Sequence, residues 1–376
     1  MCCESGPRRR ICCLCESWAS GGIESLLCNV LTRLDMKELE VDIVAAQMDD
    51  SVFTERLRAR GVRFYELSGN IRRVGENRRR FRVLMQERRY DVLHLNAFQG
   101  LSLGYLRIAK EEGVPVRIAH SHNTALRKSL TRPVKLVIHN WARRRYTKDA
   151  TDLWACSRDA AAFLFSAAEL QRRGFQFIPN GIDVERFRFN AAGRAAVRHE
   201  LGLDGKLVIG HVGRLCYQKN QGFLLDVLAE VVKKRPESGL LLVGEGEDKA
   251  MLEKKARRLG ITDKVLFYGV AEHMERLYWA MDAFAFPSRF EGLGIVAIEA
   301  QAAGLPVICS DRVPREAAAT DLAEFLPIRK SEEQWAERLT ACGQERRRDM
   351  NSAVRQAGYD VSQTAEKLRR FWAASP

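Results

Sequence analysis

The amino-acid sequence predicts an α/β protein of two domains, each built on a doubly wound parallel sheet. Short apolar runs alternate with amphipathic helical patterns over residues 10–178, and the same alternation starts again over residues 207–328. The runs are apolar at nearly every residue, which is typical of parallel strands covered by helices on both faces. The 376 residues are enough for two domains of about 150 residues each.

The first half is expected to contain seven strands separated by helices. The apolar residues of Gly22–Leu34 recur at helical spacing, which predicts a helix with one apolar face. Helices are also expected at Ser51–Arg60 and Leu101–Glu112, each of which ends just before a glycine that can terminate a helix. The expected strands are Arg10–Cys15, Val41–Ala46, Val62–Leu67, Asp91–Leu95, Val116–His120, Asp152–Cys156 and Phe175–Ile178.

A polar, charged segment at residues 181–205 carries no strand signal and interrupts the alternation, and a linker between two domains is expected near residue 183. We place the domains at residues 1–182 and 183–359, and we expect a last helix at about 360–376 to pack back onto the first domain. The strands expected in the second half are Leu207–Val212, Gly239–Val243, Lys264–Tyr268, Ala283–Pro287, Pro306–Ser310 and Glu324–Ile328.

Composition narrows the class of protein and its partners. With 46% hydrophobic and 29% charged residues, the chain is not disordered, collagen-like or a disulfide scaffold. No apolar run is long enough for a membrane helix, and the first fifteen residues lack a secretory signal, so we expect a cytoplasmic protein. The net charge is +13, and residues 1–190 hold 33 basic against 22 acidic residues. This favours a phosphorylated ligand or an anionic membrane surface, because no nucleic-acid motif accompanies the charge.

Five of the ten cysteines fall in the first fifteen residues: Cys2, Cys3, Cys12, Cys13 and Cys15. Cys12 and Cys15 form a C-x-x-C, but they lie in an expected strand, where residues three apart point to opposite faces. No second C-x-x-C or histidine pair follows at ligand spacing. We therefore interpret them as small core residues rather than as metal ligands.

The most informative stretch is Phe286–Asp311, in which a strand is followed by two glycines and a helix. Gly292 and Gly294 let the backbone approach a ligand, and the helix start offers free N–H groups to a phosphate. Glu291 and Glu299 are eight residues apart, a span of about 12 Å if helical throughout. One carboxylate can then meet sugar hydroxyls and the other ribose hydroxyls of a nucleotide sugar.

Four further motifs stand in a fixed order along the chain. Gly21-Gly22-Ile23-Glu24 follows the first strand, and His120-Ser121-His122-Asn123 stands at the end of a later one. Pro179–Asp183 marks the domain boundary, and Gly213-Arg214-Leu215 with Lys219-Asn220 opens the second domain. With the E-x7-E spacing of Glu291 and Glu299, this order resembles the retaining glycosyltransferases of family four, glycosyl transferase group one. The runs GGIES and AHSHNT are similar to those of bacterial exopolysaccharide and capsule glycosyltransferases.

The resemblance implies the GT-B fold, in which two Rossmann-like domains face a cleft. It implies a retaining hexosyltransferase that moves a sugar from a nucleotide-diphosphate donor, with a UDP-sugar ahead of GDP-mannose. The acceptor would be a glycan or a polyprenyl-diphosphate-linked oligosaccharide in exopolysaccharide or capsule biosynthesis. The first domain would hold the acceptor and the second the nucleotide sugar.

The resemblance also assigns site residues. Arg214 and Lys219 grip the donor diphosphate, while His122 and Glu291 meet the transferred sugar, and these four form the expected catalytic set. His120 is expected to point elsewhere or support the loop. His94, which is expected at a strand end, is a further candidate for the same cleft. The donor site is expected to comprise Gly21, Gly22, Arg214, Lys219, Gly269, Val270, Glu291, Gly292, Leu293, Gly294, Ile295 and Glu299.

The sequence also bears on metal binding and on contact with a membrane. The chain has no D-x-D pair, the metal ligand of the other large glycosyltransferase fold, so we expect neither a metal nor another cofactor. Arg72–Arg89 and Arg127–Lys148 form either a solvated face or a peripheral dock for anionic lipid at the inner face of the membrane.

Two other functions remain open. A sugar-nucleotide epimerase of the same fold would convert its donor without any acceptor. A non-catalytic partner in a polysaccharide assembly complex would not need Arg214, Lys219, Glu291 and Glu299 together.

Overall fold

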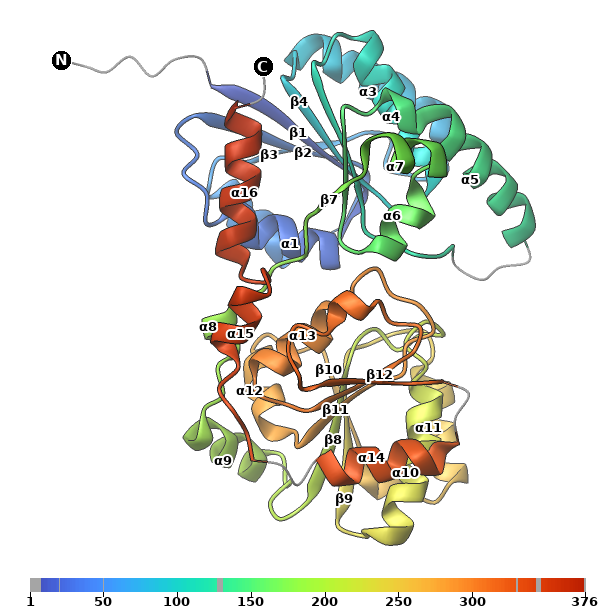
Figure 1. The fold of residues 1–376 in the computed structure, drawn as a ribbon, viewed down its shortest axis with the longest axis vertical. Helices are drawn as coiled ribbons and strands as arrows, with labels where there is room; N and C mark the ends of the chain where they lie inside the picture. Colours follow the sequence, from blue (N-terminus) through green and yellow to red (C-terminus); the bar gives the residue numbers. More distant parts are fainter. Residues whose placement is uncertain are drawn as a thin grey trace, which may run out of the picture. The chain divides into compact units, whose positions relative to one another are not determined.

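A computed structural model describes residues 8–19, 21–49, 51–126, 131–328, 331–342 and 346–374. The chain divides into two compact units (Figure 1). Unit 1 comprises the residues up to Gly181 and those from Val361 onward, and unit 2 comprises Ile182–Asp360. Each is a three-layer arrangement with a parallel sheet between helices.

Unit 1 holds a seven-stranded sheet, all of whose strand pairs are parallel. The order is β3-β2-β1-β4-β5-β6-β7, so the chain reverses its direction of travel across the sheet after β3. This confirms the doubly wound sheet expected for the first half. The strands are β1 Arg9–Trp18, β2 Leu39–Met48, β3 Arg63–Glu66, β4 Val92–Ala97, β5 Val116–Ser121, β6 Asp152–Ala155 and β7 Gln176–Phe177.

Helices cover both faces of this sheet. On one face α16 contacts α1 and β1, and α1 contacts α2, while α3, α4 and α5 form the other layer (Figure 1). The helices are α1 Gly22–Leu31, α2 Val52–Arg58, α3 Val74–Arg88, α4 Gly104–Glu111, α5 Arg132–Tyr146, α6 Arg158–Leu164, α7 Ala167–Arg173 and α16 Val361–Ala374, with short 3-10 turns η1 Gly100–Leu103 and η2 Thr147–Asp149.

Unit 2 holds a six-stranded parallel sheet in the order β10-β9-β8-β11-β12-β13. The switch point of the sheet, where the strand order reverses, lies between the neighbours β8 and β11. From β8 the chain runs through α10 to β9 on one side, and from β11 it runs through α13 to β12 on the other. The strands are β8 Leu207–Val212, β9 Ser238–Val243, β10 Val265–Gly269, β11 Ala283–Phe286, β12 Val307–Ser310 and β13 Ala323–Leu326.

The helices of unit 2 also form two layers. α10 contacts α11 and α14 on one side, and α13 contacts α8 and α15 on the other (Figure 1). The helices are α8 Val184–Phe187, α9 Ala191–Glu200, α10 Gln221–Lys234, α11 Lys249–Arg258, α12 Met274–Ala280, α13 Ile295–Ala302, α14 Glu332–Cys342 and α15 Asn351–Gln356, with 3-10 turns η3 Thr262–Lys264 and η4 Arg315–Ala317.

Residues 181–205, whose polar sequence carries no strand signal, adopt helical structure. This segment forms α8 and α9, both within unit 2. Each helix starts at a side-chain cap: Asp183 accepts from the backbone N–H of Arg186, and Asn190 from that of Gly193. Five apolar residues of the segment are buried, namely Ile182, Val184, Phe187, Val197 and Leu203, so packing and caps determine its structure.

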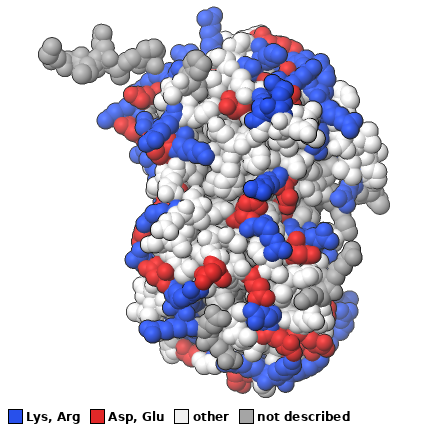
Figure 2. All heavy atoms as spheres, viewed as in Figure 1, with Lys and Arg blue, Asp and Glu red and all other residues white. Residues whose placement is uncertain are grey.

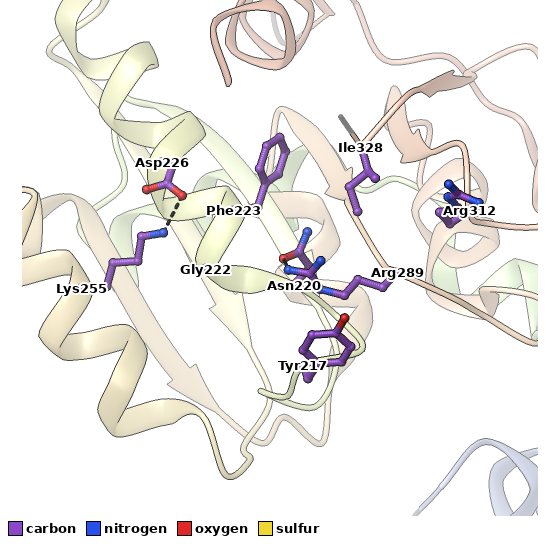
Figure 3. Close-up of a pocket in the computed structure, with 9 residues that line it drawn as sticks. All are labelled: Tyr217, Asn220, Gly222, Phe223, Asp226, Lys255, Arg289, Arg312 and Ile328. Carbon is purple, nitrogen blue, oxygen red and sulfur yellow. Dashed lines mark hydrogen bonds and ion pairs between the residues drawn. The ribbon is translucent and has the colours of Figure 1, made fainter. Parts of the chain in front are cut away.

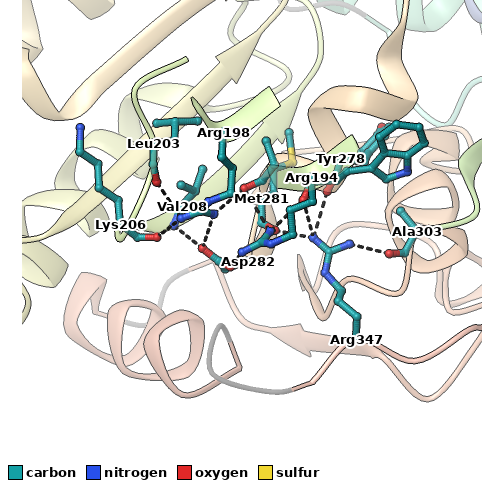
Figure 4. Close-up of polar contacts among 12 residues, drawn as sticks. Arg194, Arg198, Leu203, Lys206, Val208, Tyr278, Met281, Asp282, Ala303 and Arg347 are labelled. Atoms are coloured by element: carbon teal, nitrogen blue, oxygen red, sulfur yellow. Dashed lines mark hydrogen bonds and ion pairs between the residues drawn. The ribbon is translucent and has the colours of Figure 1, made fainter. Parts of the chain in front are cut away.

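An arginine cluster holds the end of α12 against its neighbours (Figure 4). Arg194 donates to the carbonyls of Trp279 and Met281, each at 2.8 Å, and Arg347 donates to the carbonyls of Tyr278 and Ala303 at 3.0 and 2.5 Å. The last carbonyls of a helix have no partner within it, so these side chains supply the missing donors. Burial lowers the pKa of Arg347 to about 9.

The cysteines of β1 are core residues, as expected. Cys12, Cys13 and Cys15 are buried, and Cys13 and Cys15 join the apolar cluster between the sheet and α1. Burial raises the pKa of all three thiols. Cys2 and Cys3 lie outside the described residues. Across the part of the chain that the structure describes, no helix combines the length and hydropathy needed to cross a membrane.

Candidate active site

The carboxyl ends of three strands of unit 2 meet at glycines. The N–H of Gly213 donates to the carbonyl of Val243 at 2.9 Å, and the N–H of Gly244 donates to the carbonyl of Gly269 at 2.8 Å. A Cβ on Gly244 would lie 2.3 Å from the carbonyl oxygen of Gly213. Glycine is required there because two backbones approach too closely for a side chain.

Lys219 and Glu291 form the central ion pair of this edge. The loop after β8 carries Lys219, the loop after β11 carries Glu291, and Nζ lies 2.7 Å from Oε1. Their side chains are only 16% and 8% exposed. The Lys219 ammonium also lies 5.0 Å from the centre of the Phe286 ring. Shielding from water strengthens such a pair, so both side chains are held in defined positions.

Further hydrogen bonds join the same two loops. The Gln218 amide donates to the carbonyl of Phe290 at 3.0 Å, and the N–H of Arg289 donates to the carbonyl of Gln218 at 2.8 Å. The Asn220 amide donates to the carbonyl of Pro287 at 3.2 Å and accepts from the Arg289 guanidinium at 2.6 Å. The loops therefore form one connected platform.

Arg214 is placed differently from Lys219. Its side chain is 65% exposed and pairs with Glu247 at 3.0 Å. An exposed pair of this kind is weak and exchanges readily for another anion. The structure thus provides one fixed cation, Lys219, and one exposed cation, Arg214, on the same loop.

The turn before α13 has the geometry that its glycines suggested. Gly294 is the N-cap at φ 91°, and a Cβ there would lie 2.9 Å from Cε1 of Phe286. Leu293 is buried, whereas Gly292 and Ile295 are half-buried. The helix itself starts only at Ile295, so the interval from Glu291 to Glu299 is half turn and half helix, and the span of about 12 Å for a continuous helix does not describe it.

Glu299 lies in a desolvated environment although part of the residue reaches the surface. The Tyr278 hydroxyl donates to its Oε2 at 2.7 Å. Burial raises the pKa of Glu299 to about 7, and the bond from Tyr278 opposes that rise. Near neutral pH the carboxyl can therefore act as hydrogen-bond donor or acceptor.

The end of β10 presents an exposed edge. Gly269 has φ 83°, which bends the chain away from the strand, and Val270 is 79% exposed. The turn at Gly269 and the exposed side chain of Val270 can therefore be approached by a planar ring.

In unit 1, Gly21 at the start of α1 lies beside the carboxylate of Glu24. The Glu24 Oε1 accepts from the N–H of Ala19 at 3.2 Å, and a Cβ on Gly21 would lie 2.6 Å from its Oε2. Glu24 thus caps its own helix, and Gly21 makes room for it. Gly22 is the first residue of α1, and both glycines are exposed.

Three histidines lie together at β4 and β5. His120 belongs to β5 and His94 to the interior of β4, so the expectation that His94 ends a strand was wrong. Both are fully buried, with Nε2 of His94 at 3.1 Å from Nδ1 of His120. His120 Nε2 must donate to the carbonyl of Ile178 at 3.3 Å, which fixes His94 Nε2 as donor to His120. The pair is therefore a neutral structural chain, and burial lowers the pKa of both rings.

His122 is the partly exposed member of the group. It follows β5, and its Nε2 lies 3.0 Å from the amide oxygen of Asn96. Burial lowers its pKa to about 3, so the ring is neutral at physiological pH. Its Nε2–H is used by Asn96, which leaves Nδ1 as an acceptor.

A pocket of about 560 Å³ lies in unit 1. At its polar end Glu16 accepts hydrogen bonds from Ser102 and Gln99, and burial raises the pKa of Glu16. Apolar side chains of Ile71 and Ile138 line it together with basic ones from α3 and α5. The pocket combines apolar walls with cationic groups.

The described residues contain no cluster of three or more His, Cys, Asp or Glu side chains suited to a metal ion. Of the expected site residues, the structure joins Lys219 directly to Glu291. His122, Gly21 and Gly22 belong to unit 1, and the other expected site residues belong to unit 2.

Comparison with known proteins identifies the family. The family model "Glycosyltransferase Family 4" matches residues 20–186, and "Glycosyl transferases group 1" matches residues 194–360. EpsF of Bacillus subtilis (strain 168), which is named as a glycosyltransferase, is 31% identical over 97% of this chain and 96% of its own length. The chain belongs to glycosyltransferase family 4.

One further relative and one solved structure are similar to this glycosyltransferase. A GDP-mannose-dependent alpha-(1-6)-phosphatidylinositol monomannoside mannosyltransferase of Mycolicibacterium smegmatis (strain ATCC 700084 / mc(2)155) is 32% identical over 54% of this chain and 53% of its own length. The crystal structure of Anabaena Alr3699/HepE with UDP-glucose matches with a TM-score of 0.77 at 20% identity, over 97% of this chain and 99% of the other. The latter likeness shows the GT-B fold expected from the sequence.

Sequence reasoning missed Tyr278, which contacts Glu299. The residue lies on α12, twenty-one positions before its partner, and reads there as one more apolar residue of an amphipathic helix. A buried tyrosine needs a partner for its hydroxyl, and that requirement was the available signal.

Proposed function

We propose that this glycosyltransferase moves a sugar from a nucleotide-diphosphate donor, with retention at the anomeric carbon, to a lipid-linked or polysaccharide acceptor. The observation that carries the proposal is the shielded Lys219–Glu291 pair at the carboxyl ends of β8 and β11. Ligands of doubly wound sheets bind at such a switch point. The family membership supports glycosyl transfer, and the motif order supports retention.

Lys219 and Arg214 would carry the electrostatic part of the reaction. The departing nucleoside diphosphate gains negative charge as the glycosidic bond breaks, and fixed cations stabilise that charge without rearranging. Lys219 is held by Glu291, while Arg214 can exchange Glu247 for a phosphate. The N–H groups at the start of α13 add a third positive source.

The remaining residues would position the donor. Glu291 and the neutral His122 would meet sugar hydroxyls. Glu299 would bind ribose hydroxyls, aided by Tyr278. Gly269 and Val270 would contact the base, the Gly292–Ile295 segment the diphosphate, and Gly21 and Gly22 the donor from unit 1.

The donor base is proposed to be uracil, with guanine second. Support comes from the UDP-glucose bound by the Anabaena neighbour, while the mycobacterial relative named for GDP-mannose supports the alternative. A thermal-shift screen against UDP, GDP, ADP and their sugars decides between them, because a ligand of the native state raises its apparent stability. We expect UDP to raise the melting temperature and GDP to leave it unchanged. If none of the nucleotides raises the melting temperature, the proposal is contradicted.

We further propose that transfer needs no metal. Lys219, Arg214 and the start of α13 can neutralise the diphosphate without a divalent ion. The thermal shift and the transfer rate should therefore persist in EDTA. Activity abolished by EDTA and restored by magnesium contradicts this part.

The acceptor is proposed to bind the unit 1 pocket through a diphosphate and a polyprenyl chain. The apolar walls of the pocket suit the polyprenyl chain, and its basic side chains, Arg72, Arg78 and Lys135, suit the phosphates. Exopolysaccharide or capsule synthesis remains the proposed setting on the strength of the motif likeness. Proton NMR of the transferred anomeric centre tests retention: an α-linked donor should give an α-linked product.

The same unit would dock on anionic membranes. Val134, Val137 and Trp141 of α5 are 62%, 70% and 54% exposed, and Arg143 and Arg144 stand in its last turn. Basic side chains also gather over unit 1 where α3 lies (Figure 2). Apolar anchors beside positive charge are typical of interfacial helices. Anionic vesicles should retain the protein at low salt, and failure to do so contradicts the docking proposal.

A further inference from the structure

A second cavity, of about 510 Å³, lies in unit 2 at the start of α10 (Figure 3). Side chains of α10 and α11 line it, together with residues that follow β11, β12 and β13. The volume is in the range of small-ligand pockets. None of the residues assigned above to donor binding lines it.

The lining carries positive charge that the described residues do not neutralise. Lys255 is paired with Asp226 at 2.5 Å. Arg289, by contrast, has no carboxylate partner within the described ranges: it donates to the Asn220 amide oxygen and lies over the Tyr217 ring at 4.6 Å. A guanidinium with a neutral acceptor and an aromatic ring keeps its full charge and several unused N–H groups.

Arg312 supplies a second cation, which is only weakly paired. Its nearest carboxylate in the described chain is that of the preceding residue, Asp311, at 3.8 Å. That carboxylate already accepts from the N–H of Ile328 at 3.2 Å. A contact of this length with an adjacent residue is weak. Arg312 can therefore turn to a stronger anion.

The start of α10 adds to this positive field. The helix has 14 residues, and its N-cap, Asn220, makes no side-chain cap hydrogen bond. The Asn220 side chain is used instead by Pro287 and Arg289. Gly222, in the first turn, lines the cavity and leaves the backbone accessible. The positive end of the helix dipole thus opens on the same space as both arginines.

We propose that this cavity binds a small phosphate-bearing anion, separate from the donor. Guanidinium groups pair with phosphate oxygens through two parallel hydrogen bonds, and a helix start supplies further N–H donors. Phe223 and Ile328 give the cavity apolar walls, which suits an organic phosphate monoester of sugar size better than inorganic phosphate alone. The ligand class is therefore a phosphomonoester.

The cavity is linked to the donor platform by shared loops. Tyr217 and Asn220 precede and follow Lys219 in one loop, and Arg289 stands two residues before Glu291 in the other. An anion that draws Arg289 away from Asn220 would loosen the bonds that join these loops. The anion would thereby change the position of the Lys219–Glu291 pair. This coupling rests on the proposed function, whereas the anion site does not.

The test is calorimetric titration of the full chain with glucose 6-phosphate and with inorganic phosphate in a phosphate-free buffer. Replacing both cations (Arg289→Gln with Arg312→Ala) should weaken glucose 6-phosphate binding by about tenfold or more, since two charge-assisted contacts are lost. Arg312→Ala alone, at an exposed position, should weaken it without unfolding. The matched control is Arg257→Ala, on the same helix as Lys255 and also exposed.

Comparison with Lys219→Ala separates this cavity from the donor platform. If the cavity is the site, Lys219→Ala retains glucose 6-phosphate binding and the Arg289/Arg312 variant loses it. The proposal is overturned if the two arginine substitutions leave the affinity unchanged, or if Lys219→Ala alone abolishes binding. Equal binding of inorganic phosphate and glucose 6-phosphate would overturn the phosphomonoester class.

The coupling between the cavity and the donor platform is tested by the affinity for UDP. Saturating glucose 6-phosphate should change the affinity for UDP in the wild-type protein, and the change should disappear in the Arg289/Arg312 variant, because linkage between two sites is reciprocal. An unchanged UDP affinity overturns the coupling but leaves the anion site standing. Absence of UDP binding altogether overturns the proposed function instead.

Discussion

At the scale of single residues, the site depends on side chains whose positions are fixed by their neighbours. Lys219 is held by Glu291 and Phe286, and Glu299 by Tyr278. Glycines make these contacts possible where backbone and side chains approach closely. At Gly213 a Cβ would meet Cε of Lys219 at 3.1 Å. The chemistry therefore relies on small residues as much as on charged ones.

Replacing Gly294 by alanine tests this dependence. The residue has φ 91°, and the new Cβ would lie 2.9 Å from the Phe286 ring, so unfolding free energy should fall by about 1–3 kcal/mol. Denaturant unfolding gives the value. Gly75→Ala is the control, because Gly75 lies in α3 with no atom within 4 Å of its Cβ position and should be tolerated. Equal effects of the two substitutions would contradict the argument.

The buried histidines predict a loss of stability in acid. Burial lowers the pKa of His94 from 6.5 to about 3, so below pH 6.5 the unfolded chain takes up a proton that the folded chain refuses. Unfolding free energy should then fall with falling pH, by about 1.4 kcal/mol per unit for this group between pH 6 and pH 4. His94→Asn should reduce that slope relative to wild type.

The exposed His199 on α9 provides the control for this measurement. His199→Asn should leave the pH slope of the wild-type protein intact. If His94→Asn and wild type lose stability in parallel between pH 6 and pH 4, the ring is not buried in its neutral form.

At the scale of secondary-structure elements, caps decide where helices begin and end in this chain. Asp183 and Asn190 start α8 and α9 within a polar segment, and the arginine cluster closes α12. The position of α12 matters for the site because it carries Tyr278. Elements far apart in the sequence therefore hold α12, and with it Tyr278, through backbone carbonyls.

Arg347→Ala should destabilise unit 2 by about 3 kcal/mol, because it leaves the carbonyls of Tyr278 and Ala303 without donors. Thermal or urea unfolding measures this. Its neighbour Arg346 is exposed, so Arg346→Ala serves as the matched control and should change stability little. Indistinguishable stabilities of the two variants would show that the cluster is not a cap.

At the scale of the whole molecule, the last helix belongs to the first unit. The chain leaves unit 2 after Asp360, and α16 places Val361, Leu368 and Trp372 in the core beside β1 and α1. A Cβ on Gly181 would lie 2.6 Å from Cα of Val361, so the start of α16 packs directly against the last residue of unit 1 before the chain enters unit 2. The integrity of unit 1 therefore requires the C-terminal residues.

Trp372→Ala should cost about 3–5 kcal/mol, the usual loss for a buried tryptophan. The expected result is early unfolding of unit 1, seen as a lower first transition in differential scanning calorimetry. Binding of nucleotide, proposed for unit 2, should survive at low temperature. Arg370→Ala, on the solvent side of the same helix, is the control; a similar drop there would contradict the burial argument.

The sequence was sufficient for the fold because parallel strands buried on both faces leave a clear apolar pattern. It identified both sheets, and the E-x7-E and Gly-Arg-Leu motifs led to the loops that the structure joins. It failed for α8 and α9, whose stability comes from caps and distant packing. It also misplaced His94, which lies inside β4 rather than at a strand end, because strand ends depend on pairing with neighbours. Tyr278 and the cavity near Arg312 depend on contacts across the sheet, which no local pattern records.

The central claim is that Lys219 binds the diphosphate of a nucleotide donor. The most direct measurement is calorimetric titration of UDP, in EDTA, into the wild-type protein, Lys219→Ala and the control Arg257→Ala. We expect wild type and Arg257→Ala to bind alike and Lys219→Ala to bind at least about tenfold more weakly, the loss of one charge-assisted contact. UDP binding of equal strength in Lys219→Ala and wild type would contradict the account.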